Sequence, residues 1–185
     1  RHWPQFDGFV HSIGFAPREA ISGDFLEGLS REAYRTAHDI SAYSFPAMAK
    51  AALPLLRPGG ALLTLTYLGA IRAVPNYNTM GLAKASLEAS VRYLAASLGP
   101  RGVRVNGINP GGTLTGRVQE GLAVEAKMTG LAPDELLARA QAKLPLGRLG
   151  TPEEVARVAL FLASDQASYV TGAIVPMDGG ANPVV

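Results

Sequence analysis

Short, dense apolar runs alternate with longer amphipathic segments along this chain of 185 residues. We predict strands at 9–13, 61–67, 102–108 and 173–177, because each run is short, apolar and next to turn-forming Gly or Pro. The longer segments between them have apolar residues at helical spacing. Strands that alternate with helices indicate βαβ units, so the sequence predicts an α/β fold with a parallel sheet.

The first long helix is expected to begin after Ser30, whose hydroxyl makes it a good N-cap residue. Its apolar pattern continues to about Leu56. Pro46 and Pro54 lie within this stretch and should kink the helix or end it early, because proline lacks the backbone N–H.

Two further helices have clear boundaries. A helix over 77–98 follows the second strand and stops at Gly99-Pro100. Another begins at Thr151, with Pro152 at the first helical position and Glu154 where a capping box needs an acid.

The segment 113–149 differs from the rest of the chain. It holds two short helical pieces, around 118–128 and 133–143, between Gly-rich joints. A long excursion beside the carboxyl end of a strand is the usual form of a lid, and we predict one within a single domain over 1–185. A surface pair of helices with no moving part is the alternative.

Composition excludes several classes of function. The net charge is +2 without a basic cluster, which argues against nucleic-acid binding. The chain has no cysteine, so it has no disulfide or thiolate metal site. No apolar run approaches the ~20 residues that cross a bilayer, and the polar start does not resemble a signal peptide. We therefore expect a cytoplasmic protein with no membrane partner.

Two tyrosines and a lysine suggest a site where a strand leads into a helix. Tyr67 lies at or just past the carboxyl end of the predicted strand, where open α/β sheets bind ligands. Tyr77 and Lys84 are seven positions apart on the following helix, so both side chains lie on one face of it. Such a group of two phenols and an ammonium could donate a proton to an oxygen.

The sequences around these residues are similar to those of a known family. Residues 11–17, 38–45, 67–69 and 76–88 resemble the short-chain dehydrogenase/reductase superfamily and, within it, the NADH-dependent enoyl-acyl carrier protein reductases of bacterial fatty-acid synthesis. The Tyr-x6-Lys spacing is the specific part of the likeness. Ketoreductase-type members use Tyr-x3-Lys, and Gly81 occupies that position here. From Asn109 onward the chain resembles only the superfamily in general.

The resemblance implies a Rossmann-like, doubly wound parallel sheet that is incomplete. The Gly-rich first turn of the family is absent, and Arg1 falls near the end of the family's third helix. Strands 4–7 of the family fold with their helices would remain. The run 9–13 would then be an unpaired edge strand, which is prone to aggregation.

The family's activity is reduction of a trans-2-enoyl-acyl carrier protein thioester, an oxidoreductase reaction of fatty-acid biosynthesis. The resemblance implies NADH as cofactor, with NADPH as the alternative. Tyr77 would donate a hydrogen bond to the enolate oxygen, and Lys84 would bind the nicotinamide ribose. Tyr67 would orient substrate or close the site.

The resemblance also implies further contacts and an assembly. Ala16 would line the substrate side together with Tyr67 and Tyr77. The predicted cofactor-binding residues besides Lys84 are Ile13, Gly14, Gly111, Thr113 and Thr115. Helix pairs with small residues would join copies into a homotetramer.

Two other functions are possible for this sequence, and three polar residues are expected to have no catalytic role. The protein could be a ketoreductase-like or other alcohol dehydrogenase of the same superfamily, or a non-catalytic fragment that binds no dinucleotide. His11 is expected to be structural, and Asp39 and Glu88 are expected on a helix surface or at an interface.

Overall fold

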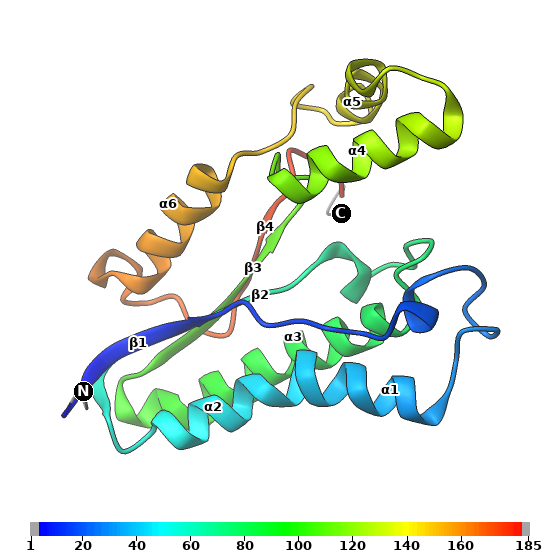
Figure 1. The fold of residues 1–185 in the computed structure, drawn as a ribbon. Coiled ribbons are helices and arrows are strands. Elements are labelled where there is room, and N and C mark those ends of the chain that lie inside the picture. Colours follow the sequence, from blue (N-terminus) through cyan, green and yellow to red (C-terminus); the bar gives the residue numbers. More distant parts are fainter. Residues whose placement is uncertain (1–3, 183–185) are drawn as a thin grey trace.

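The computed structural model describes residues 4–182, which form a sheet of four parallel strands (Figure 1). The order across the sheet follows the order along the chain. The strands are β1 (Phe6–His11), β2 (Leu56–Leu65), β3 (Arg104–Pro110) and β4 (Ile174–Met177). The predicted α/β class with a parallel sheet is confirmed.

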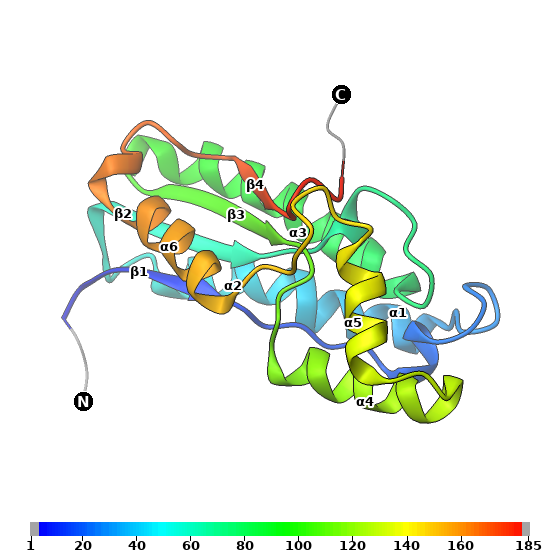
Figure 2. The same cartoon turned by 90° about the horizontal axis from the view of Figure 1, so that it is seen from above.

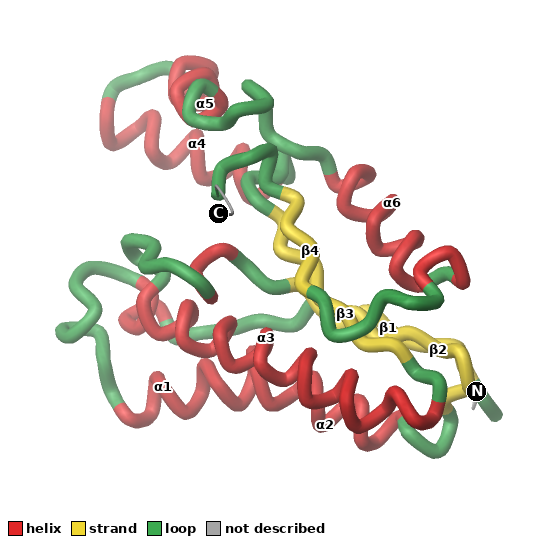
Figure 3. Tube along the Cα trace, turned by 180° about the vertical axis from the view of Figure 1, so that it is seen from behind, coloured by secondary structure: helices red, strands yellow, loops and turns green. Residues whose placement is uncertain are grey.

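Helices cover both faces of the sheet (Figures 1 and 3). One layer holds α1 (Arg31–His38), α2 (Ser44–Ala52) and α3 (Asn78–Leu98), and the opposite face carries α6 (Pro152–Ala163). Beyond the carboxyl end of β3 lie α4 (Gly116–Thr129) and α5 (Pro133–Gln141), apart from the α1–α3 layer. Shorter turns of helix lie at Arg18–Ile21, Asp39–Tyr43, Leu68–Ala70, Gly99–Arg101 and Asp165–Ala167.

The alternating directions of the side chains along the central strands explain why helices cover both faces of the sheet. Successive side chains of a strand point to opposite faces. Leu62 of β2 therefore packs with Val91 of α3, whereas Leu63 packs with Leu162 of α6. A strand covered on both faces needs a continuous apolar run, which is what β2 has. The doubly wound arrangement predicted from the sequence is confirmed.

The first long helix is interrupted and ends early, as its two prolines predict. Ser30 caps it as expected, accepting a hydrogen bond from a backbone N–H of the first turn. A π-helical turn at Asp39–Tyr43 then separates α1 from α2, shortly before Pro46. The helix ends at Ala52 because Leu53, next in the chain, precedes Pro54 and proline disfavours helix before it. The apolar pattern continues to about Leu56, but the helix ends before it, which confirms the expected effect of Pro54.

The first strand is displaced from its predicted position and forms an edge of the sheet. It covers Phe6–His11 rather than 9–13, because Phe6 already pairs with Leu56 before a shift in register. Ile13 lies in the loop that follows. Within residues 4–182, β1 pairs with β2 alone, as Figure 2 also shows, which confirms the expected edge strand.

The predicted capping box at the start of α6 is present. Thr151 Oγ1 accepts from the Glu154 backbone N–H at 3.3 Å, and Glu154 Oε2 accepts from the Thr151 N–H at 2.8 Å. Arg148 donates to the same carboxylate at 2.6 Å. The box therefore also fastens the end of the 113–149 segment to α6.

Replacing Thr151 with Ala should lower the free energy of unfolding by about 1 kcal/mol, because the first turn of α6 loses its side-chain acceptor. Urea denaturation measures this loss. Thr151→Ser keeps the hydroxyl and is the matched control, so equal losses in the two variants would contradict the capping role.

None of the helices in the described part of the chain has the length and apolar character that a membrane crossing requires.

Candidate functional site

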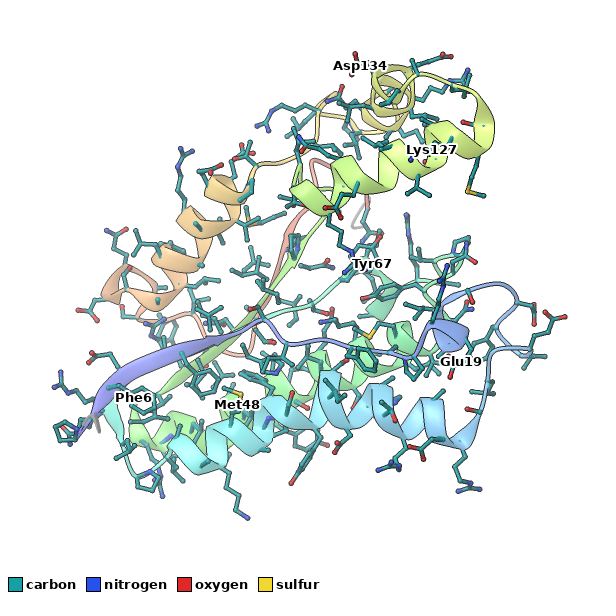
Figure 4. The ribbon with its side chains drawn as sticks, in the orientation of Figure 1. Phe6, Glu19, Met48, Tyr67, Lys127 and Asp134 are labelled. Atoms are coloured by element: carbon teal, nitrogen blue, oxygen red, sulfur yellow. The ribbon has the colours of Figure 1, made fainter. Side chains whose placement is uncertain are left out.

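The two tyrosines meet beyond the carboxyl end of β2. Tyr67 follows that strand by two residues, and Tyr77 directly precedes α3. Their ring centroids are 4.6 Å apart and the ring planes are tilted by 58°. Figure 4 labels Tyr67 between the α1–α3 layer and the overlying α4. The fold thus joins two phenols that lie ten positions apart in the sequence.

The backbone on both sides of Tyr77 is unusual. Asn76 and Asn78 have φ angles of 61° and 37°, in the left-handed region that asparagine tolerates better than most residues. Asn76 Oδ1 accepts from the Gly23 N–H at 2.9 Å, and Asn78 Nδ2 donates to the Gly23 carbonyl at 3.2 Å. Strained backbone of this kind is common at functional sites, and here it fixes the direction of the Tyr77 ring.

Two glycines make room for that ring. A Cβ on Gly69 would lie 2.3 Å from Tyr77 Cδ1, and one on Gly81 would lie 2.8 Å from the Gly69 carbonyl oxygen. Both distances are shorter than real Cβ contacts allow. The close packing at Gly81 also excludes a lysine four positions after Tyr77, so Lys84 is the basic residue that this turn of α3 can offer.

Burial keeps the Tyr77 phenol protonated. Removal from water raises the pKa of Tyr77 well above its ordinary value, and the neighbouring Tyr67 adds to the effect. Arg117, at the start of α4, acts in the opposite direction. A neutral phenol can donate a hydrogen bond at any pH at which the protein functions.

Lys84, two turns after Tyr77 on α3, is buried. Its side chain is 7% exposed, and Nζ donates to the Leu65 carbonyl at 2.9 Å. Burial lowers the pKa of Lys84 to about 8, although the charge of Glu88 opposes the shift. The ammonium has three N–H donors, and the Leu65 carbonyl accepts one of them. It can therefore still bind hydroxyl groups of a ligand.

The loop after β1 passes beside this ammonium. A Cβ on Gly14 would come within 3.7 Å of Lys84 Nζ, so Gly14 leaves the approach to Nζ open. Ser41 Oγ holds the next residue, Phe15, by accepting from its N–H and donating to its carbonyl, both at 2.9 Å. Ile13 is exposed, and Ala16 is buried in a small cluster with side chains of α1 and α3.

The remaining predicted cofactor residues lie at the base of the 113–149 segment. A Cβ on Gly111 would meet Asp178 Cα at 2.6 Å, and Thr113 Oγ1 donates to the Gly111 carbonyl at 3.2 Å. Thr115 Oγ1 caps α4. Within residues 4–182 no hydrogen bond joins these residues to the tyrosines or to Lys84.

A cavity of about 450 Å³ opens beside Tyr77. Its wall is mostly apolar and includes Phe25, Val74 and Leu82. A smaller cavity of about 170 Å³ lies at the base of the 113–149 segment, next to Thr113 and Arg148. The larger one is the natural place for an extended apolar ligand, because it borders a phenol.

Glu88 does not lie where its sequence position predicts. Glu88 was expected on a helix surface or at an interface, but it is buried, with 6% of its surface exposed. Thr66 Oγ1 donates to its Oε1 at 2.8 Å. Glu88 lies one helical turn after Lys84 and Thr66 directly precedes Tyr67, but no pattern in the sequence links Glu88 to Thr66. His11 is fully buried between Thr64 and Ser44, as a structural histidine would be.

The described residues contain no group of three or more histidine and carboxylate side chains that could hold a metal ion.

We expect Gly69→Ala to displace the Tyr77 ring and to lower the free energy of unfolding by about 1 kcal/mol, because the added methyl overlaps that ring. A crystal structure and urea denaturation measure the two effects. Gly121→Ala in α4 is the control: no atom lies near its Cβ, and alanine favours helix, so it should be neutral or slightly stabilising. An unmoved Tyr77 ring in Gly69→Ala would contradict the steric interpretation.

Comparisons with known proteins show which family this chain is similar to. A family model described as enoyl-(acyl carrier protein) reductase matches residues 1–182. The NADH-dependent enoyl-[acyl-carrier-protein] reductase of Salmonella typhimurium is 53% identical over 178 residues, which are 96% of this chain and 64% of that protein. The Neisseria meningitidis enzyme of the same description is 54% identical over 181 residues, or 97% and 66% of the two chains. This chain thus spans about two thirds of the length of these relatives.

Two solved structures of similar proteins superpose closely. The NADH-dependent enoyl-[acyl-carrier-protein] reductase of Aquifex aeolicus matches with a TM-score of 0.83 at 38% identity, covering 98% of this chain and 68% of that one. The Bacillus cereus enoyl-acyl carrier protein reductase, solved with NADP⁺ and an indole naphthyridinone, matches with a TM-score of 0.81 at 42% identity. The coverage there is 95% of this chain and 65% of that one.

Proposed function

The chain belongs to the enoyl-(acyl carrier protein) reductase family, and from this premise we propose that the protein reduces a trans-2-enoyl thioester with a nicotinamide cofactor. The observation that carries the proposal is the meeting of Tyr67 and Tyr77, 4.6 Å between centroids, beside the turn of α3 that holds Lys84. Five relatives with more than half of their aligned residues identical are described as reductases of this kind.

The chemistry of the site fits this reaction. When a nicotinamide is bound it supplies hydride to the β-carbon of the substrate. Negative charge then develops on the thioester oxygen, and the Tyr77 phenol donates a hydrogen bond to that oxygen. A preorganised donor in a dry site is usually the largest catalytic term, and burial of Tyr77 keeps this donor protonated. Tyr67 packs against the Tyr77 ring and limits its movement.

The residues around Lys84 fit a nicotinamide ribose. The ammonium is buried and bonded once to the Leu65 carbonyl, and Gly14, which has no side chain, lies beside it. The ammonium would donate to the ribose hydroxyls, while Ile13 and Gly14 would contact the cofactor through the loop. We propose NADH as the cofactor, as in the names of the enzymes from Salmonella and Neisseria, with NADPH as the alternative.

The substrate is proposed to be an enoyl chain carried by acyl carrier protein. The cavity of about 450 Å³ beside Tyr77 would take the acyl chain, since its wall is largely apolar. Ala16 would line the thioester side of the site. The 113–149 segment would act as a lid, with Gly111, Thr113 and Thr115 approaching the cofactor when it closes.

A steady-state assay tests the proposal. The chain is extended at its amino end by the part of the Neisseria meningitidis relative that it does not cover, so that the cofactor-binding half is supplied. We expect oxidation of NADH with crotonyl thioester and little with acetoacetyl thioester, followed by nicotinamide absorbance. A preference for acetoacetyl thioester would instead establish a ketoreductase.

The chain without this extension provides a second measurement. Because the Gly-rich cofactor cradle of the family is absent from this sequence, we expect no micromolar binding of NADH, measured by nicotinamide fluorescence. Tight binding would contradict the idea that the extension completes the cofactor site.

A further inference from the structure

A buried carboxyl group of α3 is bonded to the residue that directly precedes Tyr67. Glu88 of α3 is 6% exposed and Thr66 is 4% exposed. The Thr66 hydroxyl donates to Glu88 Oε1 at 2.8 Å. Burying a carboxyl group in this way is costly unless it is hydrogen-bonded, and the proposed chemistry gives Glu88 no direct task.

Thr66 lies between two residues of the candidate site. The residue before it is Leu65, whose carbonyl accepts from Lys84 Nζ at 2.9 Å, and the residue after it is Tyr67. Thr66 also ends the ladder to β3, because its N–H donates to the Ile108 carbonyl at 2.8 Å. A bond that fixes the Thr66 side chain therefore fixes both groups that flank it.

We propose that Glu88 is a positioning residue for the proposed reaction: through Thr66 it holds the end of β2, and so sets the Leu65 carbonyl against Lys84 and the Tyr67 ring against Tyr77. The inference rests on the proposed function. Glu88 positions these groups through its hydrogen bond to Thr66, and apart from that bond only its charge acts on Lys84.

The surroundings of Glu88 support a local role of this kind. Leu65 pairs with Ile108, so Thr66 and Asn109, the next residues of the two parallel strands, lie side by side on the face toward α3. Asn109 Oδ1 is buried and finds no hydrogen-bond partner among the described residues. Burial raises the pKa of Glu88, while Thr66, Arg92 and Lys84 oppose the rise. Thr66, Glu88 and Asn109 are thus buried polar residues beside the apolar core that α3 forms with the sheet.

Two substitutions separate positioning from charge. Glu88→Gln keeps a side-chain oxygen that can accept from the Thr66 hydroxyl, whereas Glu88→Leu removes it. In the extended protein described above we expect Glu88→Gln to retain kcat within about threefold. Glu88→Leu should lower kcat by about 10- to 100-fold, because small displacements of catalytic groups have effects of this size. KM for NADH should rise as well, because the displaced Leu65 carbonyl no longer holds Lys84 in place.

The double variant Thr66→Val/Glu88→Leu distinguishes positioning from stability. Replacing both partners with apolar groups can be nearly neutral for folding, whereas removing one leaves the other unpaired. We therefore expect the double variant to regain the midpoint of urea denaturation that Glu88→Leu loses, yet to keep the low kcat. If kcat recovers together with stability, Glu88 is merely structural. Leu98→Ala, at the far end of α3, is the control that loses stability without losing kcat.

A readout independent of activity uses 3-fluorotyrosine and ¹⁹F NMR, with resonances assigned by Tyr67→Phe and Tyr77→Phe. Both resonances should be unchanged in Glu88→Gln and shifted or broadened in Glu88→Leu and in the double variant. Unchanged resonances in Glu88→Leu would overturn the inference. The expected resonance changes in a protein without reductase activity would instead overturn the proposed function and leave the positioning role standing.

Discussion

Replacing Tyr77 with Phe should lower kcat for enoyl thioester reduction by roughly 100-fold, which corresponds to about 3 kcal/mol in the barrier. The phenol is the donor aimed at the position where negative charge develops, and its removal affects the transition state more than the ground state. KM for NADH should change little, because Lys84 rather than Tyr77 is the proposed ribose ligand. The measurement is steady-state kinetics with crotonyl thioester on the extended protein.

The loss should be specific to the hydroxyl of this residue. Phenylalanine keeps the ring that packs against Tyr67 and next to Gly69, so the free energy of unfolding should change little. Tyr93→Phe on the same helix is the matched control, since its side chain is 80% exposed. Tyr67→Phe is expected to have a smaller effect than Tyr77→Phe. Full activity in Tyr77→Phe would exclude the phenol as the donor.

The parts of the site that local sequence determines were predictable. The apolar run before Tyr67 indicates a buried strand, and the helical repeat after Tyr77 indicates α3, so their junction follows from pattern alone. The capping box at Thr151 is equally local. Each of these features depends on residues within one or two turns of one another.

The parts that depend on tertiary packing were not predictable from pattern. Glu88 looks like a surface residue of a helix, because burial of a carboxyl depends on a partner, Thr66, 22 residues away. The left-handed backbone at Asn76 and Asn78 is held by Gly23, more than 50 residues away in sequence. Sequence spacing could place Tyr77 and Lys84 on one face, but it could not show what holds them there.

The second large effect concerns pH and follows from the burial of Lys84. Its pKa is about 8 in the folded chain, against an ordinary value of 10.5. Between these two values the unfolded chain binds more protons than the folded one, so the free energy of unfolding rises with pH. From pH 8 to pH 10 the gain from this residue is about 2 kcal/mol. Above pH 10 the raised pKa of Tyr77 acts in the opposite sense, because unfolded tyrosine ionises first.

Urea denaturation at pH 8, 9 and 10 measures this gain as the difference between the native chain and Lys84→Met. The variant should lack the rise, whereas Lys50→Met, which replaces an exposed lysine of α2, should keep it. An equal slope for the native chain and Lys84→Met would show that Lys84 has an ordinary pKa and contradict the buried ammonium.

Cofactor binding should follow the opposite trend in the same pH range. The proposed ribose contact uses the charged ammonium, so the Kd of the extended protein for NADH should rise by up to about tenfold for each pH unit above 8. The protein would then become more stable and less able to bind its cofactor as one group loses its proton. Nicotinamide fluorescence titrations over pH 7–10 test this, and a Kd independent of pH would remove Lys84 from the cofactor site. Above about pH 8 the free energy of unfolding should rise while the affinity for NADH falls. If both trends are absent from Lys84→Met, the buried ammonium of Lys84 causes both.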